Sequence, residues 1–562
     1  MKPESAKEQR FENMATILIA SVAIWVAITA YFHNYASNIS DQARRRAQQY
    51  AIEATKREVN GAIQFSYEWQ GAFQTWREIG WQIAAAQQNG DTAAVERLLA
   101  LQERVLTLSK LLGPQYFDPA VGWPDSSKYE AESYLVESTR LSETYLAESE
   151  LGNFTDSTAD SLIVQITLLT VSLSLYGLSM ALKGRVRWLF IVVGSGIVGF
   201  CVLWLGWSLL ELLIRPEVDT KAIQAYADGV GLEYQGRYQE AIDKFTLAIE
   251  ENQYYAKAYY ERGLSYYSMG DLQTALTEME AARAQGLDDT SINWNLGWTY
   301  YLVGEYEKAL EANERVLGAT PEVLGVRMNN AISYLALGDF ENAQAQYDLL
   351  IAEAQKQVDN AHNNNAEPSA SLWYYMDAGA LDLQNLIDTL DNNLKPWTQA
   401  PGSDLIRGDH AAIRDFALKQ MKRLKESTVA LEYTGKLPTS GGNIRVEPFV
   451  FGQITGADEQ GLITGFEPAV NNVIPYGEVS FSIEFTYSGD APQEMLWKVY
   501  FNGYEDQSLR VVDKTDISSG NTWYKTFGYT YTNVFILGAG EYLVELYADN
   551  ILVQSGTFYV QE

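Results

Sequence analysis

Three long runs of apolar residues stand out along a chain in which polar and apolar residues are otherwise interspersed. Met14–Phe32 and Leu162–Leu182 carry no charge, and Trp188–Leu213 carries one, Glu211. A helix rises 1.5 Å per residue, so runs of this length can cross a bilayer core of about 30 Å. The pattern predicts a multi-pass membrane protein. Its first elements are a cytoplasmic tail at 1–13 and transmembrane helices at 14–33, 162–182 and 188–213.

The charges beside these runs indicate an orientation. The loop between the second and third runs carries Lys183, Arg185 and Arg187 and no acidic residue, and short basic loops stay in the cytoplasm. This places 34–161 and everything after residue 214 outside the cytoplasm, on the plasma membrane. Three arginines close behind the first run, residues 44–46, argue for the reverse orientation, which remains open.

Small residues within the second and third runs suggest close contacts between helices. Gly194–Gly199 matches a dinucleotide-binding fingerprint, but its position within a membrane span excludes that function. Ser195 with Gly199, and Gly177 with Ala181, have the four-residue spacing that lets transmembrane helices approach closely. The alternative is that these small side chains face lipid.

The segment at 34–161 has the periodicity of a helical bundle or coiled-coil insertion. One apolar seam steps by three and four residues through Leu98, Leu101, Val105, Leu108 and Leu112. A second, aromatic stripe consists of Phe65, Trp69, Phe73 and Trp76, and it predicts a core rather than a ligand pocket. A further helix is predicted over about 125–151. The layout resembles the four-helix sensor bundles of bacterial receptors, although no motif supports that kinship.

After Pro216 the sequence repeats every 34 residues. Glycines recur at 236, 270, 304 and 338, and a second series of small residues runs through Gly229, Gly263, Gly297 and Ala331. The large position of each second helix holds Phe245, Met279 and Tyr347, but the third repeat has polar Asn313 there. A fixed period of this length indicates stacked helix pairs. The pattern resembles the tetratricopeptide-repeat (TPR) family over 217–355, with four repeats.

The resemblance to the TPR family implies a concave groove that holds a peptide or a helix of a partner protein. The first helices of the repeats would line it, and the matching positions here are largely aromatic. They are Tyr226, Glu233, Tyr260, Tyr267, Trp294, Trp298, Tyr301 and Met328. The lysines and asparagines of a carboxylate clamp are missing from these positions. The alternative is that later helices of the same chain fill the groove.

The remaining sequence predicts two further regions. Helices at 356–436 would cap the exposed end of the solenoid, and Leu437–Asn443 is the predicted domain boundary. From Ile444 the apolar period changes to two, which predicts an antiparallel β-sandwich at 444–562. Residues 540–560 resemble the last two strands of bacterial immunoglobulin-like surface modules. The predicted fold class is therefore multi-domain: transmembrane helices with a helical insertion, an α-solenoid and a β-sandwich.

Composition narrows the chemistry. There are 41 Lys+Arg against 72 Asp+Glu, a net charge of −31, and an acidic surface of this kind repels nucleic acid. One cysteine, Cys201, and three histidines exclude an intrachain disulfide and a Cys- or His-rich metal site. Motifs of common hydrolases, metalloproteases and kinases are also missing. We expect no enzyme activity, no cofactor and no metal, while calcium binding by the sandwich loops stays open.

These observations favour a membrane-anchored TPR scaffold that binds a partner protein through the aromatic groove and organises an envelope or surface assembly. A receptor or signalling subunit that senses through 35–160 is a second hypothesis. A structural subunit of a larger membrane complex, or a homo-oligomer, is a third. The partners expected are proteins and the lipid bilayer.

Overall fold

The structure, a computed structural model, describes residues 3–395, 398–436, 444–457, 463–476, 478, 480–490, 492–513, 522–528 and 537–561. The chain divides into two compact units, Met1–Gly286 and Leu287–Glu562. The predicted boundary at Leu437–Asn443 lies outside the described residues. Each unit is taken by itself below.

The first unit is helical throughout. In chain order it contains α1 (Pro3–Tyr67), the π-helical turn η1 (Glu68–Phe73), α2 (Gln74–Gln88), α3 (Thr92–Leu108), α4 (Ser126–Glu130), the π-helical turn η2 (Ala131–Leu135), α5 (Val136–Ala181), α6 (Val186–Leu213), α7 (Thr220–Tyr234), α8 (Tyr238–Glu251), α9 (Ala256–Ser268) and α10 (Leu272–Ala284). Among the described residues, three helical segments are long and apolar enough to cross a membrane. They contain the three predicted runs.

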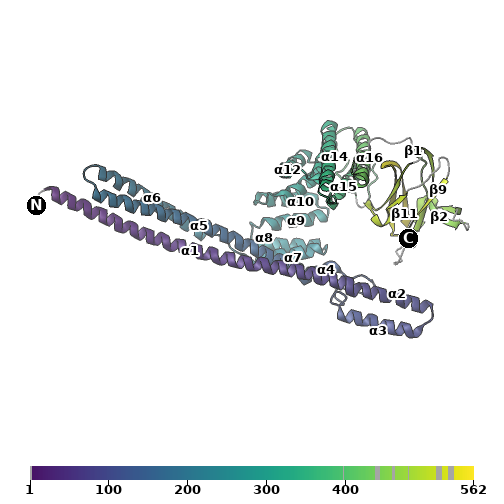
Figure 1. The fold of residues 1–562 in the computed structure, drawn as a ribbon, viewed down its shortest axis with the longest axis horizontal. Coiled ribbons are helices and arrows are strands. Elements are labelled where there is room, and N and C mark those ends of the chain that lie inside the picture. The colour runs from purple at the N-terminus through teal and green to yellow at the C-terminus, as the bar shows by residue number, and fades with distance from the viewer. Residues whose placement is uncertain are drawn as a thin grey trace. The chain divides into compact units, whose positions relative to one another are not determined.

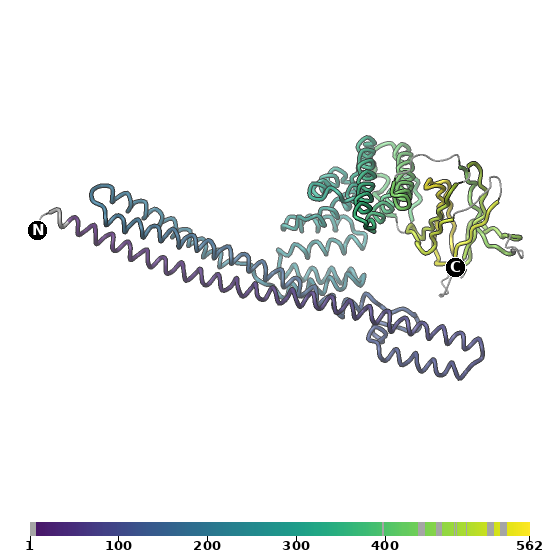
Figure 2. Tube along the Cα trace, viewed as in Figure 1, coloured from purple at the N-terminus to yellow at the C-terminus, as the bar shows by residue number. Residues whose placement is uncertain are grey.

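α1 and α5 lie side by side and antiparallel over much of their length, and α6 folds back along α5 (Figure 1). Ser40 donates a hydrogen bond to the Gly152 carbonyl at 2.9 Å. α1 continues without a break from Pro3 to Tyr67 (Figure 2). The predicted tail, the first predicted span and the beginning of the segment 34–161 therefore belong to one helix. The first two predicted membrane helices therefore extend beyond the apolar runs as the two arms of one long hairpin.

Two of the three arginines behind the first apolar run join these arms. Arg44 forms an ion pair with Asp156 at 2.5 Å, and Arg46 forms one with Glu148 at 2.8 Å. The Glu148 side chain is largely buried, so Arg46 neutralises a charge that would otherwise be costly to place between helices. Their position is thus explained by the pairing of α1 with α5.

Between the apolar segments of α5 and α6, close contact is made at Gly194 and Ser195. A Cβ at Gly194 would lie 2.8 Å from the Tyr176 ring, and the Tyr176 hydroxyl is 2.9 Å from Ser195 Oγ. The other three predicted packing residues, Gly177, Ala181 and Gly199, are exposed on the surface of this chain, and the two glycines have no neighbour within 4 Å of a Cβ. Within this chain these three residues do not pack between helices, and a packing role for them stays a prediction. The alternative, that they face outward, describes their position.

The helical insertion has an aromatic core. Phe73 is buried against Leu112, Phe117 and Tyr129, with Phe65, Trp69 and Trp76 packed around it. The predicted coiled-coil seam is not formed. α3 ends at Leu108, and Leu101 and Leu108 are exposed, because the chain turns away after Leu108 and inserts Leu111 and Leu112 into the aromatic cluster.

The repeat spacing has a simple geometric origin. Gly236, Gly270, Gly304 and Gly338 all have φ between 71° and 83°, the left-handed region in which glycine ends a helix without strain. In the first unit, a Cβ at Gly229 would lie 2.5 Å from the Phe245 ring. Gly263 has the same relation to Met279, at 3.1 Å. The glycine of each first helix therefore makes room for the large side chain of the second helix. As a result, α7–α8 and α9–α10 pack as pairs.

The second unit begins with helices α11 (Thr290–Leu302), α12 (Tyr306–Ala319), α13 (Leu324–Ala336), α14 (Phe340–Asn363), α15 (Ala370–Leu390) and α16 (His410–Thr434). α11–α12 and α13–α14 are again pairs. In the third repeat, where the large position holds a polar residue, a Cβ at Gly297 would lie 2.0 Å from Asn313 Oδ1. Asn313 is fully buried, and both polar atoms of its side chain lack a hydrogen-bond partner among the described residues.

Strands follow in two sheets. They are β1 (Ile444–Val446), β2 (Val450–Ala457), β3 (Ile463–Pro468), β4 (Val473–Pro475), β5 (Ser480–Gly489), β6 (Met495–Phe501), β7 (Tyr504–Glu505), β8 (Val511–Asp513), β9 (Thr522–Gly528), β10 (Gly540–Ala548) and β11 (Ile551–Gln561), with short 3-10 turns η3 (Val470–Asn472) and η4 (Gln507–Leu509). One sheet has the order β1-β5-β2-β3 with β9 on β5, and the other β4-β11-β10-β6-β7 with β8 on β6. The pairing is antiparallel except between β4 and β11, which are parallel. Phe481, Trp497 and Phe558 belong to the shared core.

Candidate functional site

The predicted groove residues fall in both units and have different surroundings. In the first unit, Tyr226 of α7 is buried and packs against Phe245 at 5.8 Å and Tyr255 at 5.0 Å between ring centroids. Its hydroxyl donates to Glu261 at 3.4 Å. Tyr226 is therefore part of the core between helix pairs. Tyr260 and Tyr267 of α9 are partly buried.

Glu233 lies in an acidic pair on the same helices. The Ser265 hydroxyl donates to Glu233 at 3.1 Å, and Glu261 stands next to it on α9. Burial, reinforced by repulsion from the Glu261 carboxylate, raises the pKa of Glu233 well above the value of a free glutamate. Burial also raises the pKa of Glu261. One proton is thus retained between the two carboxyls at a pH where exposed carboxyls have lost theirs.

The helix pairs of the first unit are attached to α5. On α5, Glu143 accepts a hydrogen bond from the Tyr255 hydroxyl at 3.0 Å and from Lys257 at 2.6 Å. Gly231 of α7 lies directly on α5, where a Cβ would meet Val136 at 2.3 Å. These contacts join α7 and α9 to the N-terminal part of α5, before its apolar run.

In the second unit, the predicted groove is not open. α15 lies against α13, where a Cβ at Gly379 would meet the Met328 sulfur at 2.2 Å, and Tyr375 packs on Trp294 with centroids 5.5 Å apart. Met328 and Tyr301 are buried. The alternative that a later helix of the chain fills the groove therefore holds for α11 and α13, and Met328 and Tyr301 belong to the core.

A cavity of about 680 Å³ remains beside α15. Trp294 and Trp298 of α11 form part of its wall, and side chains of α13, α15, α16 and the β6–β10 sheet complete it. Residues from Trp294 to Thr557 contribute to this single space. Its size lies in the range of about 300–1,000 Å³ in which pockets bind small ligands or single side chains.

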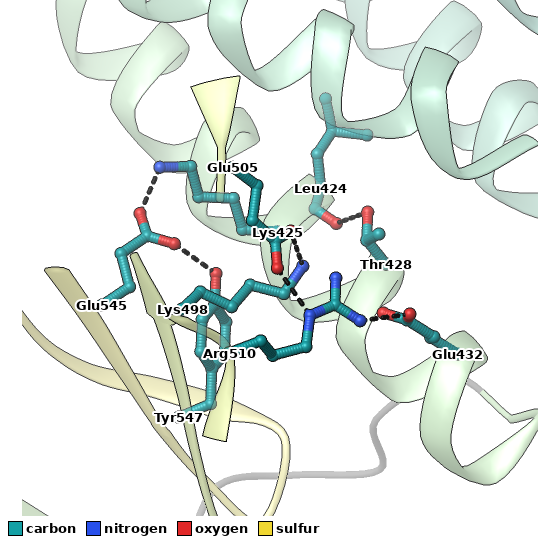
Figure 3. Close-up of polar contacts among 9 residues, drawn as sticks. All are labelled: Leu424, Lys425, Thr428, Glu432, Lys498, Glu505, Arg510, Glu545 and Tyr547. Carbon is teal, nitrogen blue, oxygen red and sulfur yellow. Dashed lines mark hydrogen bonds and ion pairs between the residues drawn. The ribbon is translucent and has the colours of Figure 1, made fainter. Parts of the chain in front are cut away.

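The basic residues in the cavity wall are already paired with carboxylates. Figure 3 shows α16 and the neighbouring strands joined by this network. Arg510 binds Glu432 of α16 and also Glu505, which accepts from Lys498 at 3.0 Å. Two further pairs are Lys425 with Glu545, whose other oxygen accepts from Tyr547, and Lys395 with Glu541. Burial would lower the pKa of Lys498, but the carboxylates of Asp377 and Glu505 outweigh it and keep this group charged.

The carboxyls of α15 are different. Asp377, Asp382 and Asp388 all line the cavity, and the described residues provide no ion-pair partner within 4 Å for any of them. Burial raises the pKa of Asp382 to about 7 and that of Asp377 to about 6, and it also raises the pKa of Asp388. No cation forms a direct ion pair with these groups, but Lys498 and Arg510 oppose the rise in the pKa of Asp377, and Lys395 opposes that of Asp388.

One amide also lines the cavity without a partner. Asn329 of α13 is 5% exposed, and its Nδ2 has no hydrogen-bond acceptor among the described residues. A buried donor without an acceptor costs about 1–3 kcal/mol, so Asn329 is a polar group that a ligand oxygen would satisfy. The described residues contain no cluster of three or more His, Cys, Asp or Glu side chains arranged to hold a metal ion.

Part of this site has a signal in the sequence that lies outside the repeat pattern. α15 reads as an apolar helix interrupted by Asp377, Asp382 and Asp388, with no Lys or Arg in the element. Acidic residues on a helix that is buried on most sides indicate either paired charges or a polar cavity. Only the position of α15 against α11 and α13 distinguishes the two.

Comparison with known proteins identifies the helix pairs. The tetratricopeptide-repeat family model matches residues 260–323. No curated protein matches the sequence. The crystal structure of MamA is 20% identical, covering 25% of this chain and 83% of its own, with a TM-score of 0.24. YrrB, described as a TPR protein with an unusual peptide-binding site, is 19% identical over 29% of this chain and 81% of its own, with a TM-score of 0.23.

A third similar structure is MamA 41-end from Desulfovibrio magneticus RS-1, 17% identical over 33% of this chain and 96% of its own, with a TM-score of 0.24. Such TM-scores carry no conclusion about function. The family match and the interlocking glycine positions agree on the same segment. The chain therefore contains a tetratricopeptide-repeat region around residues 260–323.

Proposed function

We propose that this protein is a membrane-anchored scaffold that binds a partner protein at the cavity of its second unit. TPR regions generally mediate protein–protein interaction, and this one is part of a chain with three helices apolar enough to span a membrane. The observation that carries the proposal is the 680 Å³ cavity, whose wall combines Trp294 and Trp298 of a TPR helix with the unpaired amide nitrogen of Asn329. Aromatic anchors of this kind dominate the energetics of many interfaces.

Only some of the predicted groove residues belong to the proposed binding site. Tyr226, Tyr301 and Met328 stabilise the fold, whereas Trp294 and Trp298 are accessible from the cavity. Glu233, Tyr260 and Tyr267 stand on the helix pairs of the first unit, which we assign to attachment and stability. We take the two-sheet region to be the predicted immunoglobulin-like sandwich, with its β6–β10 sheet forming one wall of the binding site.

Co-purification with a membrane-anchored full-length protein tests the proposal. Trp298→Ala should lower capture of a crosslinked partner, identified by mass spectrometry and confirmed by reciprocal capture, by at least about tenfold, because a central aromatic anchor contributes about 2 kcal/mol or more. Tyr476→Ala is the matched control, since Tyr476 is an exposed aromatic of the same unit away from the cavity. Equal capture by both variants would reject the cavity as the binding site.

We further propose that the helix pairs and sheets lie outside the cytoplasm. The basic loop at Lys183–Arg187 supports this orientation. The ion pairs of Arg44 and Arg46 with α5 remove much of the argument for the reverse, because they give these arginines a structural role. Protease added to intact cells should then degrade the C-terminal unit. Full protection in intact cells, with digestion after lysis, would reverse the assignment.

A signalling role is the second candidate, and one observation favours it. Glu143 and Val136 connect α7 and α9 to α5, which continues into the membrane as a single helix. A displacement of the repeats could therefore reach the membrane spans. Disulfide crosslinking between α1 and α5 inside the membrane, compared with and without bound partner, tests this role. An unchanged crosslinking pattern would reject the signalling role and retain only the scaffold role.

A further inference from the structure

The cavity of the second unit has a charge imbalance that arises from one helix. Its basic side chains are bound to other carboxylates: Lys395 to Glu541, Lys425 to Glu545, and Arg510 to Glu432 and Glu505. The three aspartates of α15 have no such partner among the described residues. The cavity therefore contains carboxyl groups that no cation binds directly, and its cations are not available to bind an anion.

The aromatic part of the wall suits a cation as well. Trp294 and Tyr375 pack together at 5.5 Å, Trp298 and Trp373 stand in the same wall, and Tyr374 is 64% exposed at the rim. The face of an aromatic ring attracts ammonium and guanidinium groups, by about 0.5–2 kcal/mol depending on desolvation. Carboxylates and rings in one partly closed space provide both kinds of attraction.

Asn329 adds a requirement that a bare amine does not meet. Its amide nitrogen is buried at the cavity wall without an acceptor, so it is satisfied by a ligand that brings an oxygen. A residue within a polypeptide carries a carbonyl oxygen a few ångströms from its side chain. The cavity volume accommodates one long side chain with its flanking backbone but not a folded element.

From these features we propose that the cavity binds the ammonium or guanidinium group of a lysine or arginine side chain presented by a partner protein. The carboxylates of Asp377 and Asp382 meet the positive charge, the rings of Trp294 and Trp298 contact the aliphatic stem, and the Asn329 amide donates to a backbone carbonyl of the same segment. This inference rests on the proposed function and specifies the chemistry of the partner.

Isothermal titration of the full-length protein in detergent micelles tests it with three probes. They are acetyl-Ala-Lys-Ala-amide, its norleucine isostere and n-butylamine, which is the charged end of lysine alone. The lysine peptide should bind at least about tenfold more tightly than the norleucine peptide, since only the former carries a charge for the aspartates. It should also bind at least about tenfold more tightly than n-butylamine, which offers no oxygen to Asn329.

Variants locate the effect. Asp377→Asn and Asp382→Asn should each weaken binding of the lysine peptide about tenfold and leave the norleucine peptide unaffected. Asp391→Asn is the matched control, because Asp391 follows the same helix but pairs with Arg414 outside the cavity. If Asp382→Asn fails to fold, Asp377→Asn and Trp298→Leu carry the test.

Three results would overturn the inference. Equal affinity for the lysine and norleucine peptides would exclude charge recognition. Absence of binding at millimolar lysine peptide would exclude the site, and n-butylamine binding as tightly as the peptide would reassign it to a free amine. Failure of the proposed function looks different. If the proposed function fails, Trp298→Ala leaves partner capture intact. If only the present inference fails, acetylation of the partner's lysines leaves its capture unchanged.

Discussion

The two units use the same 34-residue repeat in different ways. In the first, the large position of each second helix is apolar, Phe245 or Met279, and the helix pairs are fixed to α5 by Glu143. In the second, the corresponding position in α12 is Asn313, and α15 covers the face that the repeats would otherwise leave open. The repeat motif therefore specifies how helices pair, while the neighbouring helices decide whether a face is attached to α5 or covered by α15.

The largest expected difference between the units is at the large position. Phe245→Ala should lower the stability of the first unit by about 3–5 kcal/mol, because a fully buried ring leaves a cavity against Gly229. Asn313→Ala should lower that of the second unit by less than about 1 kcal/mol, since it removes two buried polar atoms without partners. Hydrogen exchange under denaturant, read by mass spectrometry for each unit, measures both. Equal losses would show that the two positions are equivalent.

A smaller effect is expected where the repeats meet α5. Glu143→Ala removes the acceptor for Tyr255 and Lys257, and hydrogen bonds to a charged group contribute about 1.5–3 kcal/mol in total at such a partly buried site. Faster hydrogen exchange in α9, with no change in α11–α16, is the predicted result. Glu240→Ala, which removes an exposed pair with Arg237, serves as control and should leave α9 unchanged. Unaltered exchange in α9 of the Glu143 variant would mean that α7 alone holds the repeats on α5.

The smallest effect separates the acidic groups by pH. Because burial and Glu261 raise the pKa of Glu233 in the folded state, the folded protein binds more protons than the unfolded one between the two pKa values. Stability from this pair is therefore lost as pH rises from about 5 towards 8. Glu233→Gln should be nearly as stable as the natural protein at pH 5 and more stable at pH 8, by thermal unfolding of the first unit. A constant difference across this range would mean that the pair does not retain its proton.

Much of the helical fold could be predicted from local pattern. The apolar runs and the glycines at 236, 270, 304 and 338 depend on spacing along one helix or one turn, which sequence reports directly. The seam at Leu101 and Leu108 was predicted wrongly for the same reason. Its periodicity is compatible with a coiled coil, but the chain beyond Leu108 packs Leu111 and Leu112 into a separate aromatic core.

The site was less predictable because it depends on contacts between distant segments. Repeat position predicts Trp294 and Trp298 as groove residues, but Met328, which has the same repeat position as Trp294, is buried against α15. Tyr301, one helical turn beyond Trp298, is also buried and packs against Trp298 and Tyr306. The cavity also requires Arg510 and other residues of the sheets, more than 200 positions further along the chain. Periodicity within a helix contains no information about which later helix covers it, and this is why the aspartates of α15 were missed.

Photo-crosslinking in living cells tests the central claim most directly. A benzophenone amino acid replacing Tyr374, which is 64% exposed at the rim of the cavity, should form an adduct with one defined protein, and Trp298→Ala in the same chain should abolish it. The same amino acid replacing Tyr476 should give no such adduct. Adducts of equal yield at both positions, or an adduct at residue 374 that persists in the Trp298 variant, would contradict the assignment of this cavity as the binding site.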